Sequence, residues 1–467
     1  MKTASLTMFA LVVAGMTTST NVADEPIDIG SRLELFVDSH LIDRLDGDAR
    51  QHLHRPTPRE VVLTTDEPWE GNTSAYFSIF ADNGLYRMYY RGSHFDEQTK
   101  KATHPEVTCY AESKDGIHWT KPALGLFEYD GSKENNIVWR GVGTHCFTPF
   151  KDENPDCPAD ARYKAISRGR PIGKKGLYVF KSADGVVWSL MHPDPVITKG
   201  AFDSQNLAFW DPHIKKYREY HRIFTDGVRD VMTGTSTDFV HWTDPVLLDY
   251  PGASREHLYT NAVRFYERAP HILIGFPTRY LPNENSRVEP VLMTSRDGRT
   301  FHRFKEAVIS EDAPKDRRGN RSNYMTWGLL SLPGDDMHLS VYATEAYYTG
   351  PDSRVRRFEY RVDGFVSVRG SNAGGSLLTK PLTFAGKSLA VNYATKKGGS
   401  LRVELQNADG EPLDGFSLDD CRPMRGSEIE QSVAWKNGGD VSALAGKPVR
   451  LRFKLKNADL FSMTFNP

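Results

Sequence analysis

The chain has 467 residues, with 59 lysines and arginines against 60 aspartates and glutamates, so its formal net charge is −1. This balance gives no support for nucleic acid or an anionic membrane surface as the main partner. Charged residues make up 25% of the chain, which is ordinary for a globular protein. The length predicts two or three domains, unless a repeat architecture absorbs most of the chain.

The first 23 residues have the pattern of a secretory signal peptide. Lys2 supplies a positive start, residues 8–14 form a short apolar core, and Ala23 offers a small residue before a cleavage site. The apolar run is far shorter than the ~20 residues that a membrane span needs, and no later segment is long and apolar enough. The sequence therefore predicts a soluble mature protein that is secreted or periplasmic, with no membrane span.

Residues 33–42, after the signal peptide, have the apolar character of a strand. They lie outside the repeats described below, and we expect this strand to complete the last unit of a closed ring, since closure removes exposed sheet edges. Residues 47–68 contain Pro56, Pro58 and Pro68 and are interpreted as a connecting segment.

A seven-residue motif then recurs along the chain. Four copies, at residues 113–119, 182–188, 236–242 and 295–301, place an Asp two residues after a Ser and an aromatic residue four after the Asp. Asp-Gly favours a tight turn, the Ser can bond the turn backbone, and the aromatic ring can cover the turn. A weaker fifth copy contains Asp363. We interpret these aspartates as structural turn residues, not as catalytic acids.

Each motif closes a similar group of strands, in which an apolar strand is followed by a second strand rich in Tyr and Arg. Five such groups, with their aspartates 54 to 69 residues apart, predict a five-bladed β-propeller over residues 24–370. Residues 371–467 contain short β runs between Gly-Gly and Asp-Gly turns, which predict a C-terminal β-sandwich. The predicted fold class is therefore all-β.

The four cysteines include no Cys-x-x-Cys pair, so no zinc or thiol-redox motif is indicated, and we predict no metal and no cofactor. Cys146 and Cys157 are close enough in sequence to bridge a hairpin loop in an oxidising compartment. Two free thiols are an equally good interpretation.

Innermost strands line the axis of a propeller, and ligands usually enter at one mouth. Just upstream of three expected inner strands the sequence supplies Glu70, Asp203 and Glu256. Two carboxylates with separated pKa values are what glycosidic cleavage needs, because one protonates the leaving oxygen and the other attacks the anomeric carbon or activates water. We predict Glu256 as proton donor, Asp203 as nucleophile or base, and Glu70 as a second base or pKa modulator.

Aromatic and polar residues near the same strand ends are predicted to bind a carbohydrate substrate, by stacking on sugar faces or by bonding hydroxyl, carboxylate or sulfate groups. They are Trp69, Asn72, His54, Arg55, His145, Asn206, His257, Tyr259, Arg321, Asn323, Tyr324 and Trp327.

Residues 235–242, Thr-Ser-Thr-Asp-Phe-Val-His-Trp, resemble the Ser-x-Asp-x-x-x-Trp blade motif of glycoside hydrolase family 32. Residues 35–38 and 69–71 resemble segments of exported bacterial family-32-like proteins. With the five-blade pattern and a following sandwich, the chain resembles the superfamily of glycoside hydrolase families 32 and 43. This resemblance implies an exported glycoside hydrolase with its site at the propeller mouth.

Two other functions are compatible with the same sequence. A non-catalytic carbohydrate-binding propeller has the same fold and aromatic residues without a pair of acids at working distance. A structural or protein-binding propeller is the third possibility, and scattered acids at the mouth would favour it.

Overall fold

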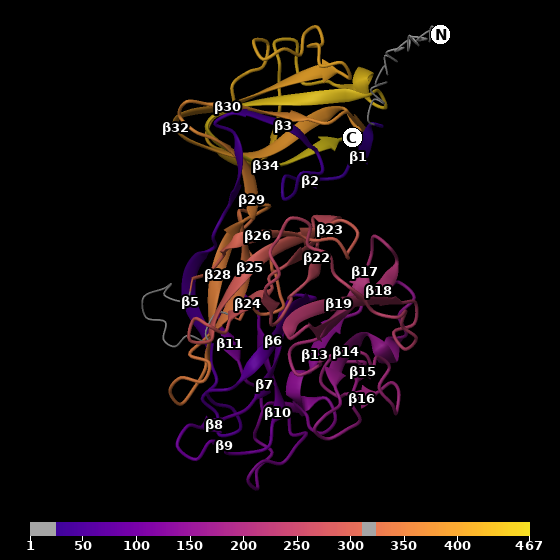
Figure 1. Ribbon diagram of the computed structural model, residues 1–467, viewed down its shortest axis with the longest axis vertical. Helices are drawn as coiled ribbons and strands as arrows, with labels where there is room; N and C mark the ends of the chain where they lie inside the picture. Colours follow the sequence, from indigo (N-terminus) through magenta and orange to yellow (C-terminus); the bar gives the residue numbers. More distant parts are fainter. Residues whose placement is uncertain (1–24, 311–323) are drawn as a thin grey trace, which may run out of the picture.

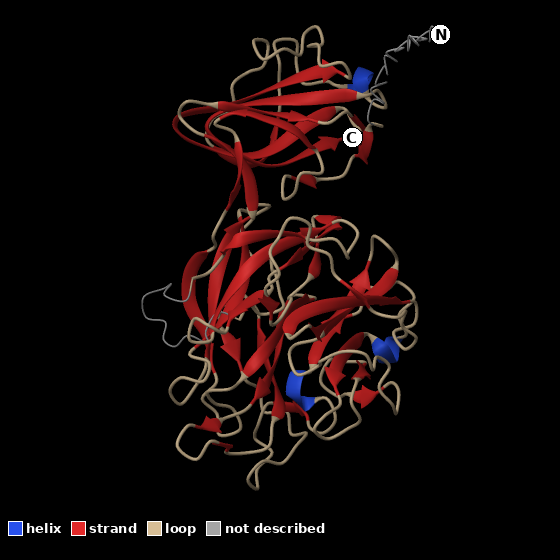
Figure 2. Cartoon of the chain, in the orientation of Figure 1, coloured by secondary structure: helices blue, strands red, loops and turns tan. Residues whose placement is uncertain are grey.

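The computed structural model describes residues 25–310 and 324–467. The chain forms a large lobe and a smaller one, joined by a narrow strand connection (Figure 1). Strands dominate both lobes, and the described part of the chain has three short 3-10 helices, η1 (Thr144–Cys146), η2 (Ala159–Ala161) and η3 (Ser442–Leu444) (Figure 2). The predicted all-β class is confirmed, and the predicted signal peptide lies outside the described residues.

The larger lobe is a five-bladed β-propeller, as the repeats predicted. Its blades are numbered in chain order, and the strands of each blade are given from the innermost outward. Blade 1 contains β6 (Ala75–Asp82), β7 (Leu85–Gly92), β10 (Val107–Ser113) and β11 (Trp119–Thr120), with β12 (Ile137–Trp139) beside β10. Blade 2 contains β13 (Thr148–Lys151), β14 (Tyr163–Arg168), β15 (Leu177–Ser182) and β16 (Ser189–Leu190). Blade 3 contains β17 (Leu207–Asp211), β18 (Lys216–Thr225), β19 (Val228–Ser236) and β20 (Val246–Leu247).

The last two blades are less regular. Blade 4 contains β22 (Arg264–Tyr266), β23 (Ala269–Gly275), β25 (Arg287–Ser295) and β26 (His302–Ala307), extended by β21 (His257–Leu258) and β24 (Thr278–Leu281). Blade 5 contains β27 (His338–Glu345), β28 (Arg354–Arg361) and β5 (Thr57–Thr64). The inner position of blade 5 is taken by residues 325–330, which bridge to β27 through Met325 and Leu330. A small hairpin, β8 (Phe95–Asp96) and β9 (Lys101–Ala102), follows β7.

The N-terminal segment closes the ring, but with a different strand from the one predicted. β5 pairs antiparallel with β28 as the outer strand of blade 5, so the interpretation of residues 47–68 as a connection was wrong. Pro58 lies in β5 opposite Phe358, at the edge of the sheet, where a residue without an N–H is tolerated. The prolines of this segment therefore do not prevent a strand.

The smaller lobe combines both ends of the chain in one network of ten strands. Four come from the N-terminal segment: β1 (Ile27–Gly30), β2 (Glu34–Leu35), β3 (Ile42–Gly47) and β4 (Arg50–Leu53). The others are β29 (Val366–Gly370), β30 (Gly375–Thr379), β31 (Leu382–Phe384), β32 (Ser388–Asn407), β33 (Ser427–Ser432) and β34 (Val449–Asn466). The strand expected at residues 33–42 thus pairs here, through β2 and β3, and not in the propeller. This lobe has its own core, which includes Trp435 and Phe453.

The recurring motif forms the capped turn that was predicted. In its first copy, Oδ1 of Asp115 accepts hydrogen bonds from the N–H groups of Ile117 and His118, both at 2.8 Å. Oγ of Ser113 accepts the N–H of Gly116 at 2.9 Å. The same bonds recur around Asp184, Asp238 and Asp297. The carboxylates of these four aspartates serve the turn backbone, so the structural interpretation of these copies is confirmed.

Three of these turns each accept a hydrogen bond from a tyrosine of the preceding blade. The hydroxyl of Tyr220, in blade 3, donates to the carbonyl of Gly298 in the blade 4 turn at 2.8 Å, and its ring lies 6.0 Å from that of Phe301. Tyr89 and Tyr342 bond the turns of blades 2 and 1 in the same way. The motif therefore joins neighbouring blades as well as neighbouring strands.

The fifth copy has a different role from the one predicted. The buried carboxylate of Asp363 accepts hydrogen bonds from Tyr266 and Arg268 of blade 4 and from Asn392 and Ser462 of the smaller lobe. Asp363 therefore connects the two lobes, because its partners belong to both.

The four cysteines are free thiols, so the structure contains no bridge between Cys146 and Cys157. Among the described residues, no helix has the length and apolar character that a membrane crossing requires.

Candidate active site at the propeller mouth

A closed chain of contacts surrounds one end of the propeller axis, where the inner strands begin; all join two side chains except that of Tyr76 with the backbone carbonyl of Asp203. It runs through Tyr76, Arg91, Tyr347, Tyr324, Tyr259, Arg222 and Asp203, and back to Tyr76. Its members come from blades 1, 3, 4 and 5 or the segments leading into them, and His145 adds the contribution of blade 2, 5.7 Å from the ring of Tyr76. We call this set, with the groups bound to it, the mouth cluster.

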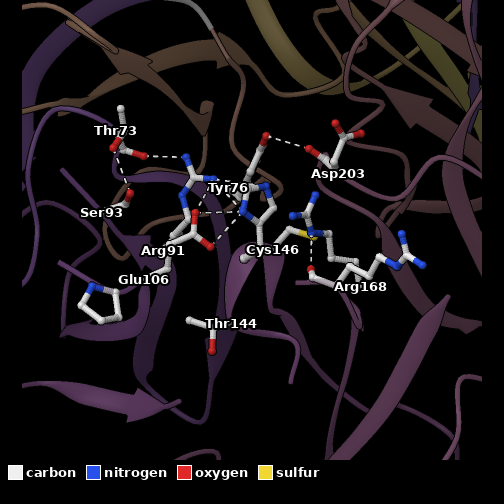
Figure 3. Close-up of polar contacts among 12 residues, drawn as sticks. Thr73, Tyr76, Arg91, Ser93, Glu106, Thr144, Cys146, Arg168 and Asp203 are labelled. Carbon is white, nitrogen blue, oxygen red and sulfur yellow. Dashed lines mark hydrogen bonds and ion pairs between the residues drawn. The ribbon is translucent and has the colours of Figure 1, made fainter. Parts of the chain in front are cut away.

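Arg91 makes most of the contacts of the mouth cluster on the side of blade 1. Its guanidinium lies 4.8 Å from the ring centre of Tyr76 and donates to the carbonyl of Thr73 at 2.7 Å (Figure 3). It also donates to the hydroxyl of Tyr347 at 3.0 Å. Only 4% of the Arg91 side chain is exposed. This cation is therefore held rigidly beneath the mouth by two aromatic residues and a backbone carbonyl.

Glu106 and His145 lie next to Arg91 and are more exposed than it is. Nδ1 of His145 lies 2.9 Å from the Glu106 carboxylate, which is also 3.5 Å from Arg91 (Figure 3). Burial and the Arg91 charge lower the pKa of His145 to about 4, so its imidazole is neutral at pH 7. Burial alone would raise the pKa of Glu106, but His145 and Arg91 lower it to about 2. Glu106 is therefore a fixed anion.

Asp203 is the exposed carboxylate of the mouth cluster. Its side chain is 56% exposed and forms an ion pair with Arg222, whose side chain is 3% exposed. The hydroxyl of Tyr76 donates to the backbone carbonyl of Asp203 at 3.3 Å. Burial lowers the pKa of Arg222, because its charge is taken out of water. Asp203 therefore stands at the surface of the mouth above a buried cation.

A cavity of about 220 Å³ opens beside these groups. It is lined mainly by tyrosines, Tyr259, Tyr280, Tyr324, Tyr347 and Tyr348, together with Arg229. The guanidinium of Arg229 lies 5.0 Å from the ring centre of Tyr259 and 4.6 Å from that of Tyr280. Aromatic faces and a cation thus meet in one concave surface, which suits a sugar carrying polar groups.

The three predicted catalytic acids do not share partners. Glu70 is 0% exposed at its side chain, and accepts hydrogen bonds from Tyr90 at 2.5 Å and Lys121 at 2.7 Å. Glu256 is bound by Arg279 at 3.2 Å and Arg303 at 3.1 Å, within blade 4. Only Asp203 belongs to the mouth cluster. The three acids are therefore held by separate sets of side chains.

Two more of the predicted binding residues support local structure. Trp69 donates its indole N–H to Asn136 at 2.7 Å, and its ring packs against Tyr129. The buried amide of Asn72 bonds the backbone of Phe95 and Gly350, and so holds two loops near the mouth.

Three further predicted residues lie elsewhere. Trp327 is buried on the axis, bonds the carbonyl of Val263, and lines a second cavity of about 200 Å³ bounded by β6, β13 and β17. His54 and Arg55 line a cavity between the lobes, of about 580 Å³, where His54 contacts Ser367.

The remaining predicted residues lie at or below the mouth, or are not described. His145, Tyr259 and Tyr324 belong to the mouth cluster, and Nδ1 of His257 accepts the backbone N–H of Arg229. Asn206 is buried beneath it and donates to the carbonyl of Phe202. Arg321 and Asn323 lie outside the described residues.

The sequence did contain a signal for the arginines that the prediction missed. The second strands of blades 1 to 3 each carry an arginine near the mouth: Arg91 in β7, Arg168 at the end of β14, and Arg222 in β18. Arg168 lies beside Cys146 in Figure 3, with its Nε bonded to the carbonyl of Arg170. These arginines lie on second strands, which also end at the mouth, and not upstream of the inner strands, where the site residues were predicted.

Comparison with known proteins gives a fold likeness and no family assignment. No family model and no curated protein matches the chain. Similar solved structures include a thermostable family-43 glycoside hydrolase, with 14% identity and a TM-score of 0.47 over 67% of this chain and 96% of that one. A β-1,2-mannobiose phosphorylase from Listeria innocua has 13% identity and a TM-score of 0.46 over 64% and 92%. A GH32 β-fructofuranosidase of Bombyx mori has 10% identity and a TM-score of 0.41 over 89% and 94%.

Two of these three structures are described as glycoside hydrolases of families 43 and 32. Identities of 10 to 14% with TM-scores below 0.5 do not identify a reaction for this chain.

Proposed function

We propose that this chain is an exported glycoside hydrolase that binds a carbohydrate in the propeller mouth and cleaves a glycosidic bond there. The observation that carries the proposal is the convergence of aromatic rings, guanidinium groups and the exposed Asp203 carboxylate on one end of the axis. Aromatic faces bind sugar rings by stacking, and charged groups fix their orientation.

In this proposal Asp203 is the catalytic carboxylate, and it either attacks the anomeric carbon or takes a proton from the attacking water. Glu106 is the second carboxylate of the mouth. Glu70 and Glu256 are left out of the catalytic set, because they lie outside the mouth cluster and are less exposed than Asp203, with 0% and 26% of their side chains exposed against 56%. The smaller lobe, for which we propose a sandwich architecture, braces the propeller through contacts such as those of Asp363.

Substitution of Asp203 tests the assignment. Wild-type protein, Asp203→Asn and Glu106→Gln are incubated with a panel of neutral and acidic oligosaccharides, and products are resolved by chromatography. Removing a catalytic carboxylate lowers turnover by roughly 10²-fold or more. Asp238→Asn, an aspartate in a blade turn, is the matched control and retains activity. Full turnover by Asp203→Asn contradicts the assignment.

A second candidate function is carbohydrate binding without cleavage. The specific observation in its favour is that Glu106 has a pKa of about 2 and is ionised, whereas glycosidic cleavage needs a protonated acid. Binding of a saccharide that is lost in Asp203→Asn, with no product formed by the wild type, would establish this second function.

A further inference from the structure

Resting on the proposed function, we propose that the saccharide bound in the mouth is anionic, carrying a carboxylate or a sulfate group that the mouth arginines receive. The proposal concerns the substrate class and does not depend on which residue cleaves the bond. It is carried by the charges of the mouth and by the unused hydrogen-bonding groups of its arginines.

The mouth has more cations than anions. Arg91, Arg222 and Arg229 belong to it or line its cavity, and the charge of Arg168 acts on Glu106 and His145, against the carboxylates of Glu106 and Asp203. The whole chain has a net charge of −1, so this local excess of positive charge is not a consequence of overall composition.

Several guanidinium nitrogens at the mouth are buried and have no hydrogen-bond partner among the described residues. They are Nε and Nη1 of Arg222, Nε of Arg91 and Nε of Arg229. Arg222 is the clearest case, because its side chain is 3% exposed and its ion pair with Asp203 is made through Nη2. A buried N–H without an acceptor is costly, and Arg229, which lines the tyrosine cavity, places one such group beside the space that an oxyanion enters.

The aromatic residues fix the direction of these cations. Tyr259 lies 5.2 Å from the Arg222 guanidinium and 5.0 Å from that of Arg229, so one ring orients two cations. Both arginines are also within 5.3 Å of the ring of Phe224. Planar guanidinium groups that are held in place lose little entropy when they bind a carboxylate or sulfate with two parallel hydrogen bonds.

Two histidines report the same positive environment. After burial, the next cause that lowers the pKa of His145 is the charge of Arg91, and the next for His257 is the charge of Arg229. An anion placed among these arginines offsets the charges that surround both imidazoles.

Matched saccharide pairs test the proposal by titration calorimetry on the full chain. The carboxylate pair is trigalacturonate and its methyl ester, and the sulfate pair is a κ-carrageenan tetrasaccharide and its desulfated form. We expect the charged member of at least one pair to bind at least tenfold more tightly than its neutral form, since hydrogen bonds to charged groups are worth about a factor of ten or more. The responding pair distinguishes a carboxylate from a sulfate.

Charge-removing variants locate the binding. Arg229→Gln and Arg222→Met are each expected to weaken binding of the charged saccharide about tenfold or more. Arg229 is only half-buried, so its variant serves if Arg222→Met does not fold. Arg44→Gln, in the smaller lobe with a 62% exposed side chain, is the matched control and binds as the wild type does.

The inference is overturned by equal affinity for both members of each pair, or by no binding of either charged probe. It is also overturned if Arg44→Gln weakens binding of the charged saccharide as much as Arg229→Gln does. Cleavage is measured separately. If neutral saccharides are cleaved at the mouth and charged ones are not bound, the inference fails while the hydrolase proposal stands. If a charged saccharide is bound through Arg229 but not cleaved, the inference stands and the hydrolase proposal fails.

Discussion

Glu70 offers a sharp test of whether a carboxylate serves structure or catalysis. Its side chain is 0% exposed and pairs with Lys121, which is 14% exposed and also bonds the carbonyl of Thr64 at 2.8 Å and Asp66 at 2.9 Å. Replacing Lys121 by Met leaves the Glu70 carboxylate buried beside Tyr90 without its counter-charge. Breaking a buried pair in this way costs about 3–5 kcal/mol of unfolding free energy.

The reverse substitution is expected to be milder. Glu70→Gln keeps an oxygen that can accept the hydroxyl of Tyr90, and Lys121 keeps two other partners, so we expect a loss of about 1–2 kcal/mol. Urea denaturation followed by tryptophan fluorescence measures both values. Saccharide cleavage by Glu70→Gln should match the wild type wherever the variant is folded. A folded Glu70→Gln variant with normal stability and no cleavage would refute the structural role and return Glu70 to the catalytic set.

Three further predictions concern the lobe contact and the turns. Burial alone would raise the pKa of Glu34, but contacts with His271 and Arg296 lower it from 4.5 to about 2. The ionised carboxylate therefore stabilises the folded state by about 3 kcal/mol above pH 4.5, and this contribution is lost as the pH falls to about 2. Glu34→Gln should flatten the pH dependence of unfolding in that window, and an unchanged slope would contradict it. Tyr220→Phe leaves the Gly298 carbonyl without its hydroxyl donor and should cost about 1–3 kcal/mol in urea denaturation; no loss would argue against the blade contact. Asp238→Ala removes a turn cap and should cost about 0.5–2 kcal/mol without changing cleavage, which thermal unfolding and an activity assay together check.

The propeller was predictable because its blades repeat a local pattern. The Ser, Asp and aromatic positions of the motif lie within seven residues, and the bonds of Asp115 and Ser113 are made inside the turn itself. Such bonds depend on nearby sequence and hence show in it. Asp363 shares part of the pattern but bonds residues as distant as Ser462, which no local motif could indicate.

The candidate site was predictable only in part. Asp203, His145 and Tyr259 were identified from their place before inner strands, and they do belong to the mouth cluster. Glu70 and Glu256 occupy similar places in the sequence, yet each is neutralised by cations from other strands. A carboxylate that stands exposed at the mouth and one that is enclosed by cations away from it look the same in the sequence, because exposure and partner are decided by packing.

The sequence by itself determined the all-β class, the number of blades and the structural role of the turn aspartates, because periodicity and turn chemistry are local properties. Only the tertiary structure decided that residues 27–53 join the smaller lobe, that β5 closes the ring, and that arginines from second strands surround the mouth. These outcomes depend on which distant surfaces bury one another and which charges are thereby paired, and the order of residues along the chain does not record that.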